Sequence, residues 1–312
     1  MSDGLLALTM GDPAGIGPEI VLKSLSHMPR LRCRLFGSRE VFEKEQKRLR
    51  TDVDLSCVED VAGRVGVFKM GRAQRNCGAA ALACLEVGVR ELRENRLSAL
   101  VTAPVSKEAL RITGFRWPGQ TEFLAERLGS RRYTMLAWTP KFKVVFVTIH
   151  EPLARASRHI TAAAVTEKAG LLGEFLCATG VKRPRICVMA FNPHAYEFSL
   201  GEEGRIAAGV ARAREMGINA FGPIPADASL AGLLQSGHSS LPFDGYVAMY
   251  HDQAMIPAKL LGRDEGVNLT LGLGRIRTSP LHGVAFDIAG RGAASPRSML
   301  AAIRLALRLS RS

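Results

Sequence analysis

The chain has 312 residues, of which 47% are hydrophobic, an ordinary share for a globular protein that argues against intrinsic disorder. This length fits two domains or one large α/β unit, and no apolar run approaches the roughly 18 residues that would indicate a membrane helix. The start, Met1 to Asp12, lacks a basic segment and a small-residue cleavage site, so we expect a cytoplasmic protein without a membrane partner.

Lysine and arginine total 42 against 29 acidic residues, and the formal net charge of +13 favours anionic partners. Nucleic acid is one such class, and a phosphorylated or carboxylated metabolite with a dinucleotide is the other. The basic residues are dispersed, and the densest cluster, Lys182-Arg183-Pro184-Arg185, has no interleaved aromatic residues. We therefore interpret the charge as a solvated basic surface and expect no nucleic-acid partner.

Apolar runs alternate with helical patterns along most of the chain. Strands are expected at 5–10, 32–36, 99–102, 143–149, 185–191, 245–250 and 267–271. Helices are expected at 18–26, from 39 onward, and at 78–93, 162–177, 202–216 and 296–309, the last of them capped by Ser295. The alternation predicts an α/β fold, in which helices cover a parallel sheet. Because no linker marks a boundary, we expect two domains that share a sheet or interleave, with a cleft between them.

Several common catalytic signatures are absent from the sequence. There is no G-x-G-x-x-G fingerprint, and no Gly-Lys dipeptide that a P-loop would need. Neither G-x-S-x-G nor H-E-x-x-H occurs, which argues against serine hydrolases and zincins. The six cysteines include no C-x-x-C pair, so we expect reduced, mostly buried thiols rather than a zinc ribbon or a disulfide framework.

Three of the seven histidines follow predicted buried strands. His150 follows Val-Val-Phe-Val-Thr-Ile, His194 comes two residues after Ile-Cys-Val-Met-Ala-Phe, and His251 follows Tyr-Val-Ala-Met-Tyr. The carboxyl ends of parallel strands form one edge of a sheet, where three imidazoles could bind one divalent metal. The alternative for each histidine alone is a loop or cap residue. Asp252 could orient a ligand histidine, or it could be a helix N-cap.

Polar side chains follow other predicted strands. Asp12 lies in the glycine-rich turn Gly11–Gly17, where it could face a ligand or act as a local cap. Lys107 could face an anion or be solvated, and Ser106 before it could cap a helix. Gln120 and Thr121 open a further helix, whose first N–H groups favour an anion, although Thr121 could also be a plain cap.

A second group of polar residues follows His251 in the sequence. Lys259, Asn268 and Arg277 together offer an ammonium, an amide and a guanidinium, a combination that suits a phosphate or a carboxylate. From composition alone, each of the three is more often a solvated side chain.

At this point the motifs resemble one known family, that of 4-hydroxythreonine-4-phosphate dehydrogenase, an enzyme of pyridoxal phosphate biosynthesis. The segments that carry the resemblance run in family order over nearly the whole chain. They are 10–19 (Met-Gly-Asp-Pro-Ala-Gly-Ile-Gly-Pro-Glu), 102–107 (Thr-Ala-Pro-Val-Ser-Lys), 119–123, 192–195 (Asn-Pro-His-Ala), 222–227, 249–253 (Met-Tyr-His-Asp-Gln), 267–273, 276–279 and 283–292.

The resemblance implies a two-domain fold of the isocitrate and isopropylmalate dehydrogenase type, with a cleft between the domains. A first domain is expected at 1–125 plus 288–312, and a second at 126–287, which carries the metal-ligand histidines and the dimer interface. The family binds NAD without the missing fingerprint, and it forms a homodimer whose active sites, metal site included, are shared between subunits.

The resemblance also assigns residues. It implies His150, His194 and His251 as metal ligands, and Gln120, Thr121, Lys259, Asn268 and Arg277 as substrate-binding residues. Within this scheme we take Asn192 and Gly272 as candidate cofactor contacts, and Lys107 and Asp252 as candidates for proton handling. The cofactors implied are NAD or NADP and one divalent metal, such as zinc, cobalt or magnesium.

The implied reaction oxidises 4-phosphohydroxy-L-threonine to 2-amino-3-oxo-4-phosphooxybutanoate, which decarboxylates to 3-amino-2-oxopropyl phosphate. Two departures from the family pattern bear on this substrate: Gln120 stands where the family usually has His, and Tyr196 and Phe198 add bulk after Asn-Pro-His-Ala. Gln donates a hydrogen bond but carries no charge. The alternative is a dehydrogenase of the same family that acts on threonate or erythronate 4-phosphate, or on a cis-dihydrodiol of an aromatic acid.

Overall fold

The computed structural model describes residues 5–231, 242–262 and 264–311. The chain folds into two compact units. The first unit comprises Met1–Arg131, Asp264–Asn268 and Leu273–Arg311, and the second comprises Arg132–Arg263 and Leu269–Gly272. The chain therefore leaves the first unit twice, after Arg131 and after Asn268, and strand β10 (Val267–Leu271) contributes residues to both units.

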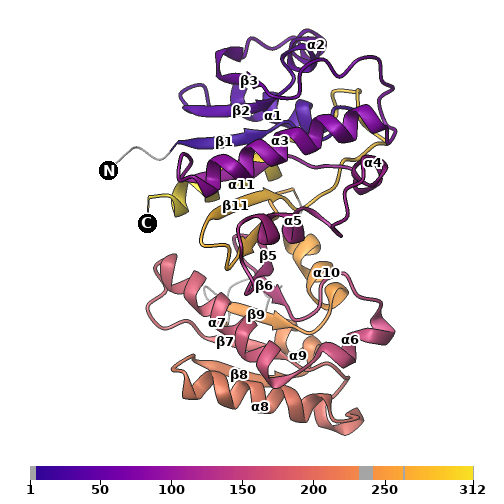
Figure 1. The fold of residues 1–312 in the computed structure, drawn as a ribbon. Coiled ribbons are helices and arrows are strands. Elements are labelled where there is room, and N and C mark those ends of the chain that lie inside the picture. Colours follow the sequence, from indigo (N-terminus) through magenta and orange to yellow (C-terminus); the bar gives the residue numbers. More distant parts are fainter. Residues whose placement is uncertain (1–4, 232–241, 263, 312) are drawn as a thin grey trace. The chain divides into compact units, whose positions relative to one another are not determined.

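The first unit is built on parallel strands in the order β3 (Val58–Asp60), β2 (Cys33–Gly37), β1 (Leu6–Thr9), β4 (Ala99–Thr102) and β11 (Ile276–Pro280). Its helices are α1 (Gly17–Ser26), α2 (Arg39–Leu49), α3 (Arg75–Arg93), α4 (Lys107–Ile112), α5 (Gln120–Arg127) and α11 (Arg297–Leu309), with a 3-10 turn, η1, at Leu55–Cys57. Helix α3 packs on β1, β2 and β4, and α11 packs on β4 and β11 (Figure 1). Because helices cover the strands, all four residues of β1 and of β4 are buried, as parallel sheets require.

The second unit has the strand order β5 (Thr134–Trp138), β6 (Lys143–Phe146), β9 (Gly245–Ala248), β7 (Ile186–Met189) and β8 (Ala220–Ile224). Strands β5 and β6 form an antiparallel pair, and the other pairs are parallel. Its helices are α6 (Leu153–His159), α7 (Ala162–Ala178), α8 (Glu202–Glu215), α9 (Ala226–Leu230) and α10 (His251–Gly262), with a 3-10 turn, η2, at Ala195–Phe198. Helix α7 packs on the strands and on α8.

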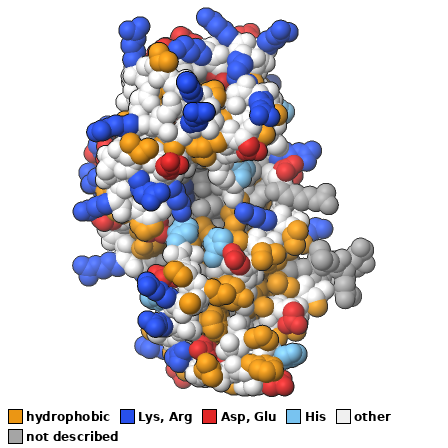
Figure 2. Space-filling model, turned by 90° about the vertical axis from the view of Figure 1, so that its right-hand side faces the viewer, with side chains coloured by type: hydrophobic (Ala, Val, Ile, Leu, Met, Phe, Trp, Pro, Cys, Tyr) orange, Lys and Arg blue, Asp and Glu red, His pale blue; other side chains and the backbone are white. Residues whose placement is uncertain are grey.

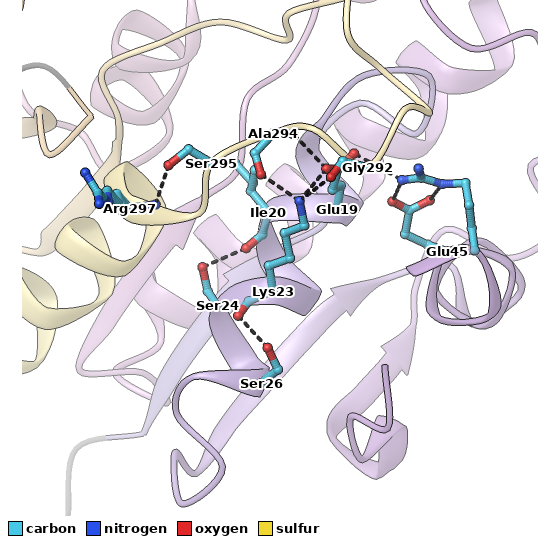
Figure 3. Close-up of polar contacts among 11 residues, drawn as sticks. Glu19, Ile20, Lys23, Ser24, Ser26, Glu45, Gly292, Ala294, Ser295 and Arg297 are labelled. Atoms are coloured by element: carbon cyan, nitrogen blue, oxygen red, sulfur yellow. Dashed lines mark hydrogen bonds and ion pairs between the residues drawn. The ribbon is translucent and has the colours of Figure 1, made fainter. Parts of the chain in front are cut away.

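A buried carboxylate ties the end of the chain to the first unit. Glu19 of α1 accepts hydrogen bonds from the backbone N–H of Ala294 (2.8 Å) and from Lys23 Nζ (2.8 Å), as Figure 3 shows. Lys23 Nζ also donates to the carbonyl groups of Gly292 and Ala294. Arg48 of α2 reaches the second oxygen of Glu19 at 3.0 Å. The segment before α11 is therefore fixed against α1 by charge-assisted hydrogen bonds.

The α/β class and the main elements predicted from the sequence are confirmed. One cap is wrong: Pro296, not Ser295, occupies the N-cap position of α11. Strand β6 ends at Phe146, three residues before the predicted end, and the chain continues as a loop.

On the face shown in Figure 2, lysine and arginine side chains are scattered in separate groups rather than gathered in one band. Within the described part of the chain, no helix is long and apolar enough to span a membrane.

Candidate functional site

A buried guanidinium is the centre of the first group of predicted site residues. Arg277 of β11 is only 1% exposed. Its Nη2 donates to Thr102 Oγ1 at 2.6 Å and to Gln120 Oε1 at 3.0 Å, and its Nε lies 3.2 Å from Thr102 Oγ1. We call Arg277, Thr102 and Gln120 the arginine cluster. It joins the end of β4, the start of α5 and strand β11; the sheet register brings Thr102 and Arg277 together, and Gln120 is the first residue of α5.

The electrostatics of the cluster favour an anionic ligand. Burial lowers the pKa of Arg277 to about 10, an effect that the nearby carboxylate of Glu122 opposes, so the guanidinium stays charged at neutral pH. Thr102 and Gln120 are neutral partners that satisfy hydrogen bonds without cancelling this charge. The first backbone N–H groups of α5 have no acceptor within the helix and add a second preference for negative charge.

The other predicted residues of the first unit lie on α5, β10 and α4. Thr121 is buried in the first turn of α5, whose N-cap is Gly119, so Thr121 is not the cap. Asn268 of β10 has a buried side-chain oxygen without a hydrogen-bond partner among the described residues. Lys107 is exposed at the first position of α4, and Ser106 caps that helix by accepting from the backbone N–H of Ala109 at 3.1 Å.

The glycine-rich turn after β1 carries a buried carboxyl group. Asp12 has no exposed surface, and its Oδ1 accepts the backbone N–H of Ala14 at 2.9 Å, whereas Oδ2 has no partner among the described residues. Burial raises the pKa of Asp12 to about 6, although backbone N–H groups of Ala14 and Ser106 lower it. Gly11 before it has φ +75°, and a Cβ there would lie 2.5 Å from the carbonyl oxygen of Pro104, so only glycine fits. Perturbed carboxyl groups of this kind are concentrated at functional sites.

Two of the three predicted metal-ligand histidines lie together in the second unit. Strands β6 and β9 pair in parallel, and the pairing continues past their ends through Val147 and Thr148, whose N–H groups donate to Ala248 and Met249. This register carries the loop after β6 alongside the loop after β9. The ring centroids of His150 and His251 are 6.4 Å apart.

We call His150 and His251 the histidine pair. His251 Nδ1 lies 2.7 Å from Asp252 Oδ1, a distance that fits an N–H donated to the carboxylate. Such a hydrogen bond leaves the Nε2 lone pair for a metal and fixes the ring orientation. Both imidazoles are at least partly exposed, and His251 is the first residue of α10. The donor type, the proximity and the carboxylate partner fit a divalent metal.

The buried amide of Gln253 supports this loop, and we had not singled it out from the sequence. Its Oε1 accepts the backbone N–H of Met249 at 2.7 Å, and its Nε2 donates to the carbonyl oxygen of Ala190 at 2.7 Å. The side chain therefore joins the ends of β7 and β9 to the first turn of α10. A buried glutamine two residues after a candidate ligand is the signal that could have indicated this role.

His194 does not join the histidine pair within the chain. It adopts a left-handed backbone conformation (φ +53°) before η2, and its ring lies 5.9 Å from that of Phe198. Among residues 5–231, 242–262 and 264–311, no group of three His, Cys, Asp or Glu side chains is close enough to hold a metal ion. The three-histidine metal site therefore stays a prediction.

The remaining candidates of the second unit have local structural explanations. The side-chain amide of Asn192 donates to Glu203 Oε2 at 3.0 Å and to Glu202 Oε2 at 3.3 Å, which holds the loop against the start of α8. Gly272 has φ +81°, and a Cβ there would lie 2.1 Å from the carbonyl oxygen of Arg132. Lys259 is exposed on α10.

Comparison with known proteins places this geometry in context. The sequence model described as "Pyridoxal phosphate biosynthetic protein PdxA" matches residues 14–306. A 4-hydroxythreonine-4-phosphate dehydrogenase from Sulfurihydrogenibium sp. (strain YO3AOP1) is 36% identical over 98% of this chain and 98% of its own. A D-threonate 4-phosphate dehydrogenase from Salmonella typhimurium is 38% identical over 99% of this chain and 100% of its own.

A solved structure of this family is similar to the chain over nearly its full length. The crystal structure of 4-hydroxythreonine-4-phosphate dehydrogenase from Klebsiella pneumoniae has a TM-score of 0.85 and 36% identity, and it covers 99% of this chain and 98% of that chain. Sequence and fold thus agree over nearly the full length. The chain belongs to the PdxA family.

Proposed function

We propose that this chain is an NAD(P)-dependent, divalent-metal-dependent dehydrogenase that oxidises 4-phosphohydroxy-L-threonine. Its product, 2-amino-3-oxo-4-phosphooxybutanoate, decarboxylates to 3-amino-2-oxopropyl phosphate in pyridoxine biosynthesis. The observation that carries the proposal is the full-length similarity to dehydrogenases of that name. The oxidation transfers a hydride from the substrate carbon to the nicotinamide, and the hydroxyl proton passes to a protein group or to water.

The arginine cluster supports recognition of an anionic group. A buried, charged guanidinium that donates to Thr102 and Gln120 binds phosphate or carboxylate strongly, because no bulk water competes for it. We assign the anionic end of the substrate to Arg277, Gln120, Thr121, Asn268 and Lys259. The buried oxygen of Asn268 gains a hydrogen-bond partner if the substrate presents an ammonium or a hydroxyl group there.

We assign the metal to His150, His194 and His251. When bound, a divalent metal lowers the pKa of the substrate hydroxyl and stabilises negative charge at the reacting carbons. The carboxylate of Asp252 acts through His251, by holding its ring and keeping the proton on Nδ1. Lys107 is the candidate for proton transfer, with Asp252 as its alternative, and Asn192 and Gly272 are the candidate contacts of the nicotinamide dinucleotide.

We further propose a homodimer in which a second copy of the chain completes the metal site. Exposed large apolar side chains of the second unit flank the candidate ligands: Tyr196 and Phe198 follow His194, and Ile256 and Leu260 lie on α10 after His251. Exposed apolar side chains of this size indicate a protein interface. On this basis the dimer contacts lie on the second unit, which also carries the three candidate ligand histidines. A cytoplasmic location, where thiols stay reduced, completes the proposal.

A second candidate substrate is D-threonate 4-phosphate. The Salmonella typhimurium relative of that name is as similar to this chain as the hydroxythreonine phosphate enzymes are. The two substrates share the carboxylate, the C3 hydroxyl and the C4 phosphate, and they differ in the C2 substituent, which is an amine in one and a hydroxyl in the other. The neutral side chain of Gln120, held by Arg277, is compatible with either one.

Reduction of NAD or NADP with each phosphate substrate, with and without a chelator, tests the proposal. We expect metal-dependent turnover of 4-phosphohydroxy-L-threonine that exceeds turnover of D-threonate 4-phosphate. Faster turnover of the threonate would transfer the assignment to the second candidate. Turnover that persists in metal-free buffer would contradict the metal assignment, and a folded dimer that turns over neither substrate would contradict both candidates.

A further inference from the structure

Two cysteines of the first unit lie side by side, away from the predicted site residues. Strands β2 and β3 pair in parallel with Leu35 opposite Val58, and the same register carried back two residues puts Cys33 opposite Ser56. Cys57, the last residue of η1, is the next residue along. Cys57 Sγ donates to the carbonyl oxygen of Asp54 at 3.7 Å, and Cys33 and Cys57 line the same pocket.

The same two thiols line a pocket that small molecules can enter. The pocket has a volume of about 870 Å³, and its lining includes Cys33, Cys57 and the segment from Leu25 to Arg32. Cys33 is buried at 8% exposure, whereas Cys57 is partly exposed. The pair thus has one sulfur that an incoming reagent can reach and one buried sulfur on the wall of the same pocket.

The surroundings make the two sulfurs chemically unequal. The interaction between the two thiols lowers the pKa of Cys57 and raises that of Cys33. Arg39 also lowers the pKa of Cys57, while burial and the carboxylate of Asp54 oppose these effects. Because the thiolate is the nucleophile, Cys57 is the sulfur expected to react first.

The other four cysteines lack this combination. Burial raises the pKa of Cys77, Cys84 and Cys187 to about 12, which leaves them protonated at neutral pH. Cys177 is exposed on α7 in the second unit. It therefore provides an internal control for an accessible thiol outside the pair.

We propose that Cys33 and Cys57 form a reversible oxidation site that reacts with hydroperoxides and closes to a disulfide. The Cys57 thiolate attacks one oxygen of hydrogen peroxide and breaks the O–O bond; the other oxygen takes a proton and leaves as water. The sulfur of Cys33 then attacks the resulting sulfenic acid, the S–O bond breaks, and the released hydroxide takes the Cys33 proton and leaves as a second water. The two thiols lose two electrons, the peroxide gains them, and an external dithiol reverses the reaction.

The disulfide would join the two ends of segment 33–57, which holds β2, α2 and η1. Cys33 is at the amino end of β2, whereas Thr102 of the arginine cluster is at the carboxyl end of β4, which runs parallel to it through β1. The pair is thus at the opposite edge of the sheet from the arginine cluster. Replacement of Cys57 is therefore expected to leave the basal turnover of the reduced enzyme unchanged.

The test treats the full-length protein with hydrogen peroxide, alkylates the remaining thiols and identifies the peptides by mass spectrometry. We expect a Cys33–Cys57 disulfide that dithiothreitol removes. In Cys33→Ser, dimedone should trap a sulfenic acid on Cys57, and in Cys57→Ser, Cys33 should stay reduced. Cys177→Ser is the matched control and should form the disulfide as the unmodified chain does.

The same experiment can overturn the proposal. Alkylated Cys33 and Cys57 under conditions that oxidise Cys177 would show that the pair is an ordinary packed contact. Disulfides that link two copies of the chain through Cys57 would also contradict it. Circular dichroism and turnover of the reduced variants establish that each is folded, so neither result can be ascribed to misfolding.

Discussion

The arginine cluster of the first unit and the histidine pair of the second differ in how completely the fold assembles them. Arg277 is 1% exposed, and its guanidinium is fixed by a buried hydrogen bond to Thr102 and a partly buried one to Gln120. The side chain of His251 is 40% exposed and that of Asp252 is 74% exposed. The cluster is organised before any ligand arrives, whereas the pair has two of the three predicted imidazoles and leaves His194 apart.

This difference indicates whether folding or ligand binding orders each site. Burial of a cation costs several kcal/mol unless hydrogen bonds and charge compensate for it, so the fold itself stabilises the arginine cluster. The histidine pair costs the fold little, because water still reaches it. Its order is expected to come from binding, either of a metal or of a second copy of the chain.

The largest expected effect is at the histidine pair. Substitution His150→Ala removes one of the three proposed metal ligands, so if the proposal is right, metal-dependent turnover should disappear. Stability should change by less than about 0.5 kcal/mol, because the side chain is exposed. Turnover with graded metal and thermal unfolding of the apo protein measure the two effects. Retained turnover in metal-free buffer would refute the three-histidine site.

Substitution in the arginine cluster, unlike His150→Ala, should lower the stability of the fold as well as substrate binding. Substitution Arg277→Lys keeps the charge but removes the planar fork that contacts Thr102 and Gln120. We expect weaker substrate binding by about 1.5–3 kcal/mol, or roughly tenfold to over a hundredfold in KM, together with a lower melting temperature. Thr102→Val is the matched control: it removes the hydroxyl partner but leaves Arg277 in place. An unchanged KM in both variants would exclude Arg277 from the substrate site.

The sequence predicted the strands that deliver these residues better than it predicted how the side chains meet. Buried apolar runs located β4, β6 and β9, although β6 and β9 end earlier than predicted, and the polar residues that follow them include His150 and His251. The contact between Arg277 and Gln120 depends on β11 lying beside β4, a pairing between segments far apart in the chain that periodicity cannot indicate. The roles of Thr102 and Gln253 were missed for the same reason, since each acts through partners on other elements.

Local backbone geometry also limited the prediction. Ser295 followed by Pro296 has the pattern of a capped helix start, yet Pro296 takes the N-cap position, and Ser295 Oγ lies 3.4 Å from the N–H of Arg297. Gly272 is required by its positive φ and by the backbone of Arg132, which comes close only in the folded chain. The identity of such a residue is visible in a sequence, but the reason for it is not.

A smaller effect is expected at the carboxylate that orients the histidine pair. Substitution Asp252→Asn keeps the shape of the side chain but weakens the hydrogen bond to His251 Nδ1. Partners of this kind change metal affinity by about 10- to 100-fold, so turnover at low metal should fall and excess metal should restore it. Lys259→Met, on the same helix, should raise KM at every metal concentration instead. Failure of excess metal to rescue Asp252→Asn would point to a direct catalytic role for Asp252.

The smallest effect is expected at Asp12, where a substitution should increase the free energy of unfolding. Burial raises the pKa of Asp12 to about 6 from 3.8, so the folded state favours the protonated carboxyl group. The stabilising contribution is therefore complete below pH 3.8 and is lost as the pH rises through 6, and about two pKa units correspond to about 3 kcal/mol. Asp12→Asn keeps an acceptor for the N–H of Ala14 but cannot ionise, so we expect about 1–2 kcal/mol more stability at pH 8 and little change at pH 4.

Denaturant unfolding of both proteins across this pH range measures the effect, and Asp54→Asn is the control. Asp54 is exposed and its pKa is lowered by hydrogen bonds from Ser56, so its removal should give no gain at high pH. An Asp12→Asn variant that loses stability with rising pH as steeply as the unmodified chain would assign the titration to another group. Turnover then decides what the buried charge is for. If Asp12→Asn is more stable but turns over more slowly, the Asp12 carboxylate destabilises the fold and contributes to the reaction. If Asp12→Asn is more stable and equally active, the Asp12 carboxylate is not needed for the reaction. The main contribution of the first unit to the site is then the preorganised arginine cluster.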